Sequence, residues 1–374
     1  MDSKKRPFKF PVSILIGSTP ANILRVIKGH RIDLRYYPKF MLTFLVSIIF
    51  EFFNLAEKLL YFKKLRKTHI NEQPVFIIGF WRSGTTMLHS FLCQDPQAGY
   101  VTTFQGVFPN LVLSQNKWFK SFVNSILPKN RPFDGYAMDM DFPQEEDFAM
   151  MSLQPKSLYK MFYFPKDYKN IYAKELYLEQ LTENERKRWK SNYLSLISKA
   201  MLSTGGKRYF SKNPCNIFRV KTLTELFPDA KFIFIYRNPY PVVESLYRFA
   251  NAILPGSELQ HLDKGIPRSF FIQLYKEAID EYLRIKTSIT PQNLIEIKYE
   301  EFKKQPIEMI RDVYDRFGIE GFEKALPYMT SYFENNHPDE RKPYSIDPET
   351  YHLVNTYAGD IVTKLGYTVV QSPM

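Results

Sequence analysis

The sequence predicts an α/β protein with three layers, in which helices cover both faces of a central parallel sheet. Four short apolar segments are spread along the chain, and helical patterns separate them. These segments are apolar on both faces, as is typical of parallel strands that are buried on both sides. We expect strands at residues 75–79, 208–211, 231–236 and 294–298.

The first 70 residues predict a helical N-terminal extension. Its strongest apolar run, residues 40–53, is shorter than the roughly 20 residues that a membrane-spanning helix needs. A basic end follows, with Lys63, Lys64, Arg66 and Lys67. Two interpretations remain open: a helix buried in the core or in a subunit interface, and a helix on a membrane surface whose cations meet acidic headgroups.

Residues 71–374 are expected to form one domain. More than a hundred residues separate the first two predicted strands, which is too many for a plain crossover. We therefore expect a helical insert at about residues 100–206. In open α/β sheets a segment at this position usually covers the ligand site, so we expect the insert to contribute to a ligand-binding site.

Composition narrows the class of protein and its partners. The chain has 374 residues, 44% hydrophobic and 24% charged, which excludes wholesale disorder and fibrous repeats. The formal charge of +12 favours anionic partners, but no basic helix with interleaved aromatic residues predicts nucleic-acid binding. Two cysteines cannot build a disulfide framework, and no signal peptide is expected. We expect a cytoplasmic protein, and we leave open both peripheral contact with the inner membrane face and the oligomeric state.

A phosphate-binding loop follows the first predicted strand. Gly79 and Gly84 bracket a tight turn, and Thr85 begins a helix whose amino end suits an anion. This arrangement predicts a P-loop, with Trp81, Arg82, Ser83, Gly84, Thr85 and Thr86 as binding residues. Thr85 stands where an ATP-binding P-loop has lysine, and the cation comes from Arg82 instead. This departure disfavours a kinase or NTPase, which remains an alternative.

A second pair of polar residues lies at the third predicted strand. Arg237 follows this strand, and Ser245 lies eight residues later in a helix whose first residue we take to be Pro241. An arginine and a hydroxyl at one strand end can hold a second phosphate, because the guanidinium supplies paired donors.

The two motifs together resemble the sulfotransferases that use 3′-phosphoadenosine 5′-phosphosulfate (PAPS). The similarity extends through KNP at 212–214, LFPDAKFIFIYRNP at 226–239, IKYEEF at 297–302 and PQEEDFAM at 143–150. It covers roughly residues 74–345 and is strongest to the broad bacterial branch, in which some members act on sterols or lipids. The resemblance implies that the first motif holds the 5′-phosphosulfate, that the second holds the 3′-phosphate, and that 3′-phosphoadenosine 5′-phosphate (PAP) is the product.

The catalytic residues are expected to position the reactants and to supply charge. Arg82 would hold the phosphosulfate, and Lys212 would reach the sulfuryl oxygens as negative charge develops. The resemblance to KNP supports the role of Lys212. The similarity also implies a basic loop near the C-terminus, so Arg341 and Lys342 are candidates for the 3′-phosphate, with plain surface charge as the alternative.

A carboxylate is the expected general base. The animal cytosolic branch uses a histidine of the insert, but none lies between residues 90 and 260, and we expect His89 to have a packing role. We rank Glu145 first, then Glu146 and Asp147, with a charge that favours a helix amino end as the alternative role. No spacing typical of metal ligands is present, so we expect no metal.

The insert is rich in aromatic residues and methionine, which suits a pocket for a bulky hydrophobic alcohol. A sterol or lipid alcohol is therefore favoured over a sugar as the sulfuryl acceptor. Besides the kinase or NTPase, one further alternative stays open: a membrane-associated protein that binds the nucleotide without turnover.

Overall fold

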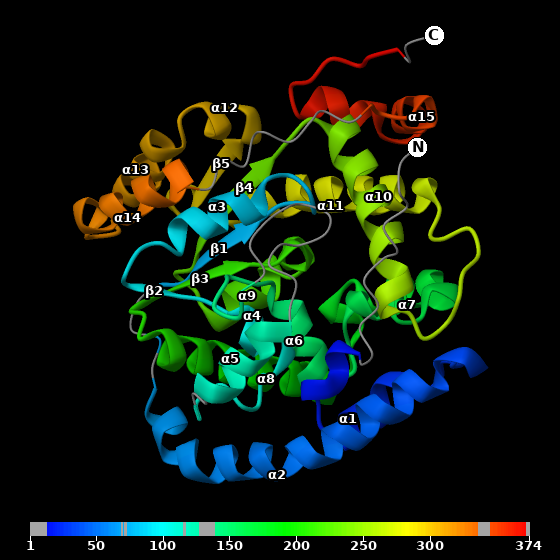
Figure 1. Ribbon diagram of the computed structural model, residues 1–374. Coiled ribbons are helices and arrows are strands. Elements are labelled where there is room, and N and C mark those ends of the chain that lie inside the picture. The colour runs from blue at the N-terminus through cyan, green and yellow to red at the C-terminus, as the bar shows by residue number, and fades with distance from the viewer. Residues whose placement is uncertain are drawn as a thin grey trace.

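The computed structural model describes residues 13–68, 70, 73–114, 117–126, 139–335 and 345–371. Its centre is a five-stranded parallel sheet in the order β2-β3-β1-β4-β5 (Figure 1). The strands are β1 (Val75–Ile78), β2 (Ala98–Gly99), β3 (Arg208–Lys212), β4 (Lys231–Tyr236) and β5 (Leu294–Lys298). The α/β fold and the four predicted strands are confirmed. The sequence prediction missed β2, because two residues carry no recognisable period.

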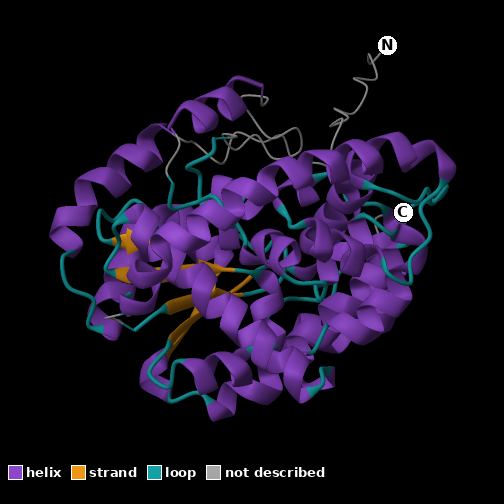
Figure 2. Ribbon diagram, turned by 90° about the horizontal axis from the view of Figure 1, so that it is seen from below, coloured by secondary structure: helices purple, strands orange, loops and turns teal. Residues whose placement is uncertain are grey.

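Alternate side chains of the central strand β1 enter two separate cores. Phe76 and Ile78 belong to one buried apolar cluster, and Val75 and Ile77 belong to another. This division follows from the two-residue period of a strand. It produces the three layers, with helices on both sides of the strands (Figure 2).

Each face of the sheet has its own set of helices. The face of Phe76 is covered by α9 (Val220–Leu226), α10 (Pro239–Ser257), α11 (Arg268–Ile285) and α15 (Pro348–Lys364). The opposite face is covered by α3 (Thr85–Leu92), α13 (Pro306–Phe317) and α14 (Phe322–Asn335), with the short α12 (Tyr299–Lys304) after β5.

The long connection from β2 to β3 is helical. It contains α4 (Thr103–Val107), α5 (Lys117–Ile126), α6 (Glu146–Leu153), α7 (Tyr168–Glu175) and α8 (Glu183–Thr204). A capping box in which Thr182 and Glu185 exchange hydrogen bonds begins α8. The role of this helical insert in acceptor binding stays a prediction, as do the predicted boundaries of the insert and of the N-terminal extension.

The extension before β1 contains η1 (Ile14–Gly17), α1 (Pro20–Ile27), η2 (Leu34–Tyr36) and α2 (Tyr37–Lys67). Two buried side chains join it to the last turn of α6. The Ser18 hydroxyl donates to the Ser152 carbonyl at 2.7 Å, and the Asn22 amide donates to the Met151 carbonyl at 3.0 Å. The extension therefore supplies partners for carbonyls that a helix end leaves unpaired.

Helix α2 runs along the outside of the molecule (Figure 1). An 18-residue window of this helix has a mean hydropathy of 1.7, so by length and composition alone it could cross a membrane. Only 22% of that window is buried. The interpretation of residues 40–53 as a helix of the core is therefore wrong, because most of its apolar side chains point away from the protein.

Candidate functional site

The loop between β1 and α3 has the backbone of an anion-binding turn. Arg82 and Gly84 both have positive φ angles, 68° and 96°, and α3 begins at Thr85. A Cβ atom at Gly84 would lie only 2.2 Å from the Tyr299 ring, so only glycine fits here. Trp81, Ser83 and Thr85 are buried, whereas the residues that alternate with them, Arg82, Gly84 and Thr86, are partly exposed. The amide groups and positive end of α3 therefore face a site that an anion can reach.

The two strands beside β1 each bring a cation to the same edge of the sheet. Lys212 is the last residue of β3 and pairs in register with Ile77, while Arg237 directly follows β4. Because parallel strands end at one edge, these cations flank the loop that leaves β1. The Arg237 guanidinium lies 4.4 Å from the centre of the Tyr299 ring. Tyr299 thus contacts both phosphate motifs, and the sequence analysis did not single it out.

The two phosphate motifs meet through one hydrogen bond. Arg82 Nε donates to Ser245 Oγ on α10 at 2.9 Å, and the guanidinium lies 5.3 Å from the centre of the Phe249 ring. Helix α10 begins at Pro239 rather than at Pro241, because the Asn238 side chain caps it. Ser245 consequently lies in the second turn, within reach of the loop.

Glu145 connects the loop to the end of β3. Its Oε1 accepts from Lys212 Nζ at 2.7 Å, and its other oxygen accepts from the Tyr159 hydroxyl. Trp81 Nε1 in turn donates to the Tyr159 hydroxyl at 3.0 Å. These four side chains form a continuous chain of hydrogen bonds, in which the Glu145 side chain is 15% exposed and that of Lys212 only 1%. Tyr159 was missed, because nothing in its local sequence distinguishes it from the other tyrosines of the insert.

The next carboxylate of the acidic cluster points into the protein. Glu146 is 1% exposed and accepts from the Tyr209 hydroxyl at 2.6 Å and from the Asn216 amide at 3.0 Å. Burial raises its pKa. The geometry thus gives Glu146 a structural position, whereas it had been a catalytic candidate.

Asp147 is held by a buried arginine. Burial disfavours its ionisation, but the charge and the two hydrogen bonds of Arg219, at 2.6 and 3.0 Å, hold its pKa below the usual range. Glu145 is the member of the cluster whose described contacts include a predicted site residue, Lys212.

His89 lies beside the site but inside the core. Burial, together with the charge of Lys212, lowers its pKa to about 3, and its Nε2 lies 3.1 Å from the Phe210 carbonyl oxygen. It is therefore neutral near pH 7, in keeping with the expected packing role. Arg341 and Lys342 lie outside the described residues, so their assignment stays a prediction.

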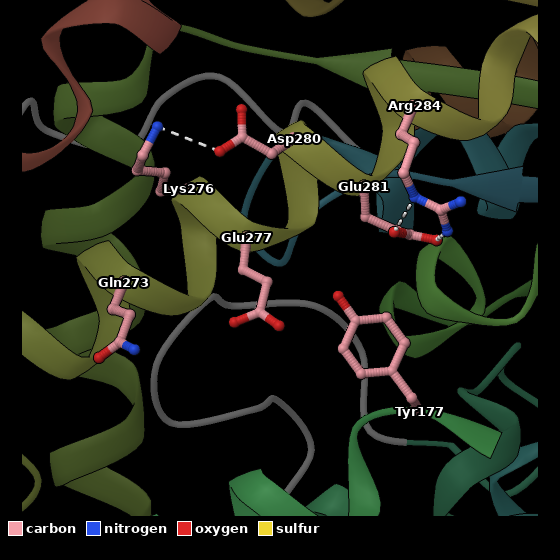
Figure 3. A pocket seen from close by; sticks show the side chains of 7 residues that line it. All are labelled: Tyr177, Gln273, Lys276, Glu277, Asp280, Glu281 and Arg284. Atoms are coloured by element: carbon pink, nitrogen blue, oxygen red, sulfur yellow. Dashed lines mark hydrogen bonds and ion pairs between the residues drawn. The ribbon is translucent and has the colours of Figure 1, made fainter. Parts of the chain in front are cut away.

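Among the residues that the structure describes, no group of three or more His, Cys, Asp or Glu side chains is placed to hold a metal ion. A hollow of about 340 Å³ does lie between α11 and Tyr177 (Figure 3). It is lined by Glu277 and by the ion pairs Lys276–Asp280 and Glu281–Arg284. None of the predicted site residues that the structure describes lines it, and its carboxylates do not suit an anionic nucleotide.

Comparison with known proteins agrees with this geometry. The model of the sulfotransferase family matches residues 74–324. Omega-hydroxy-beta-dihydromenaquinone-9 sulfotransferase Stf3 of Mycobacterium bovis is 29% identical over 338 residues, which cover 89% of this chain and 85% of the relative.

Two solved structures share the fold at 14% identity. Sulfotransferase STF1 of Mycobacterium tuberculosis H37Rv has a TM-score of 0.65, with 90% of each chain covered. STF9 of Mycobacterium avium has a TM-score of 0.67, with 93% of this chain and 91% of that chain covered. Since the family model spans well over half of the sequence, the chain belongs to the sulfotransferase family.

Proposed function

We propose that this sulfotransferase transfers the sulfuryl group of PAPS to the hydroxyl of a lipid alcohol. The observation that carries the proposal is the Lys212–Glu145 pair at the edge of the sheet where the phosphate loop begins. The Lys212 ammonium suits the transferring sulfuryl group, and the adjoining Glu145 carboxylate suits the acceptor hydroxyl.

The binding residues fit a donor with two separate anionic groups. The glycine turn at Gly84 and the amino end of α3 suit the 5′-phosphosulfate, while Arg237 and Ser245 suit the 3′-phosphate. Arg82, bonded to Ser245, lies between the two motifs. When bound, PAPS supplies an activated sulfuryl group and an anionic leaving group. Thr85 in the position of the ATP-binding lysine weighs against a kinase.

The protein's residues carry the proton and the charge. Glu145 accepts the proton of the acceptor hydroxyl as the new S–O bond forms and the S–O bond to the donor phosphate breaks. Neutralisation of Glu145 leaves the Lys212 ammonium without its counter-ion, so its charge becomes available to the leaving group when negative charge develops there. Tyr159 and Trp81 hold the Glu145 carboxylate in place.

A lipid acceptor is supported from two sides. Phe148 is partly exposed and lies edge-on to the Tyr159 ring, with centroids 5.0 Å apart, so apolar surface lies beside the proposed base. The mycobacterial relative is named for a hydroxylated menaquinone, which is a long isoprenoid lipid with a terminal hydroxyl. We therefore place such lipid alcohols before sterols as acceptors.

The test is transfer of sulfuryl label from PAPS to a panel of a hydroxylated menaquinone, a sterol and a sugar, with a chelator present. Label on a lipid alcohol that is lost in Glu145→Gln supports the proposal. Thermal unfolding with PAP, and with ATP plus magnesium, identifies the donor class, since a ligand of the folded state raises the midpoint. A shift with ATP alone would indicate a kinase. A PAP shift without transfer to any acceptor would indicate a binding protein.

A further inference from the structure

We infer that the outer face of α2 lies in the surface of an acidic lipid bilayer, with the helix axis in the membrane plane. The first observation is the inverted polarity of this helix. Its buried residues are all polar: Thr43, Ser47, Asn54 and Glu57. Their spacing of four, seven and three residues places them on one face. A helix of a water-soluble protein shows the opposite arrangement.

Hydrogen bonds at two levels fix this polar face to the protein. The Ser13 amide donates to Thr43 Oγ1 at 2.9 Å. Further along, Glu57 accepts from the amides of Leu113 and Ser114 at 2.9 and 3.0 Å and from Lys199 Nζ at 3.2 Å. Polar side chains are buried at little cost only when they have such partners, so the inward orientation of this face is well determined.

Large apolar side chains are exposed along most of this helix, from Tyr37 to Phe62. Twelve large apolar or aromatic side chains of α2 are between 41% and 77% exposed, among them Phe52, Leu59 and Leu60 at 72–77%. Helix α5, whose Phe119 ring lies 5.5 Å from the Phe50 ring of α2, also exposes Trp118 and Phe122, which stack on one another and are 74% and 50% exposed. Apolar surface this extensive marks a site of contact with a membrane or another protein.

Charge selects an acidic membrane over a second copy of the chain. Residues 58–67 contain five Lys or Arg and no acidic residue. In an antiparallel pair of α2 helices, this basic end would face the first turns of the partner helix, whose first charged residue is another cation, Lys39. In a parallel pair it would meet itself. Neither pairing would bring negative charge to the basic residues 58–67. The acidic lipids of the leaflet that faces the cytoplasm would supply it.

The same hydrogen bonds determine how the helix lies. Thr43 and Glu57 are 14 residues apart, about 21 Å along the axis. Thr43 is bonded to Ser13, in the segment whose Ser18 bonds to α6, and Glu57 is bonded to Lys199 of α8, so both ends of this span are tied to the globular body. If α2 crossed the bilayer, that body and its charged Lys199 would have to enter the hydrocarbon region, where unpaired polar groups are excluded. The helix therefore lies in the interface, as amphipathic surface helices do.

The experiment is sedimentation of the full chain with vesicles of phosphatidylcholine, alone or with phosphatidylserine added. We expect the parent to bind the acidic vesicles and to dissociate as salt rises. In Phe52→Ser/Leu59→Ser/Leu60→Ser, the binding constant should fall by at least about a hundredfold, since each buried side chain contributes roughly tenfold. The matched control is Tyr328→Ser/Tyr357→Ser, which removes two side chains that are each 56% exposed on other helices. It should bind as the parent does.

A charge variant tests the lipid chemistry separately. In Lys63→Glu/Lys64→Glu/Lys67→Glu, the preference for acidic vesicles should fall by about a hundredfold, because each cation near the surface contributes roughly fivefold. Circular dichroism and the unfolding midpoint check that each variant is folded. The inference is overturned if the parent protein does not bind acidic vesicles, or if the serine variant binds them as the parent does. It is also overturned if the parent is dimeric in solution and becomes monomeric only in the serine variant.

Discussion

The Lys212–Glu145 pair gives the sharpest test of the proposed site. In Lys212→Met, the Glu145 carboxylate loses a cation at 2.7 Å in a largely buried setting, while it keeps the hydrogen bond from Tyr159. Removing one partner of a buried ion pair costs 3–5 kcal/mol, and the remaining bond and the partial exposure of Glu145 indicate the lower end, about 3 kcal/mol. An unfolding entropy of roughly 2.1 cal/mol/K per residue then predicts a midpoint lower by about 4 °C for 374 residues.

The assay is a double-mutant cycle with Glu145→Gln, followed by thermal unfolding and by PAPS-dependent transfer. The double variant should lose about 2 kcal/mol less than the sum of the two single variants, because the second change removes a charge that the first left unpaired. Transfer should fall at least about a hundredfold in each single variant. Additive stability losses, or a Lys212→Met protein that transfers at the parent's rate, would refute the reasoning.

Three further predictions concern the loop and its surroundings. Arg237→Ala should weaken PAP binding by about 1.5–3 kcal/mol in calorimetry, and unchanged affinity would exclude the 3′-phosphate role. Gly84→Ala should lower stability by about 2 kcal/mol and weaken PAP binding, because its Cβ would meet the Tyr299 ring at 2.2 Å. The control, Gly359→Ala, meets no atom within 4 Å in a helix and should be slightly more stable. Because the pKa of His89 is lowered to about 3, its contribution to stability is present above pH 6.5 and is lost as pH falls. Relative to His89→Leu, the parent should lose about 2 kcal/mol between pH 6.5 and pH 5, and equal losses in both proteins would contradict the assignment.

The strands and the phosphate loop could be predicted because their signals are local. Each of the four strands with four or more residues coincides with an apolar run in the sequence, and Gly84 directly before a helix marks the loop. The contact of Arg82 with Ser245 joins residues 163 positions apart, so neither motif alone predicts it. Tyr299 could not be identified as a site residue from the sequence for the same reason. Its ring reaches Gly84 and Arg237 only because β5 packs beside β4.

The acidic cluster shows a second limit of prediction from sequence, at the level of neighbouring residues. Glu145 precedes α6 in an extended conformation and Glu146 is the first helical residue, so their side chains face different surroundings although they adjoin in sequence. Which one turns inward depends on Tyr209 and Asn216, which lie on and after a distant strand. For α2 a signal was present. Its polar residues share one face, but the continuous apolar run around them concealed the pattern.

The hydrogen bonds from the N-terminal extension to α6 affect which truncated forms of this enzyme would stay intact. Ser18 and Asn22 satisfy the carbonyls at one end of α6, and Glu145 precedes the other end. A protein trimmed to begin near residue 71 would exchange these two hydrogen bonds for bonds to water, at a cost of about 0.5–1.5 kcal/mol each, and would lose the buried packing of Ile23 and Val26. The loss would fall on the short helix that carries the proposed base. We therefore expect a truncation that removes residues 13–27 but keeps the whole P-loop region to be less stable and less active than the full chain.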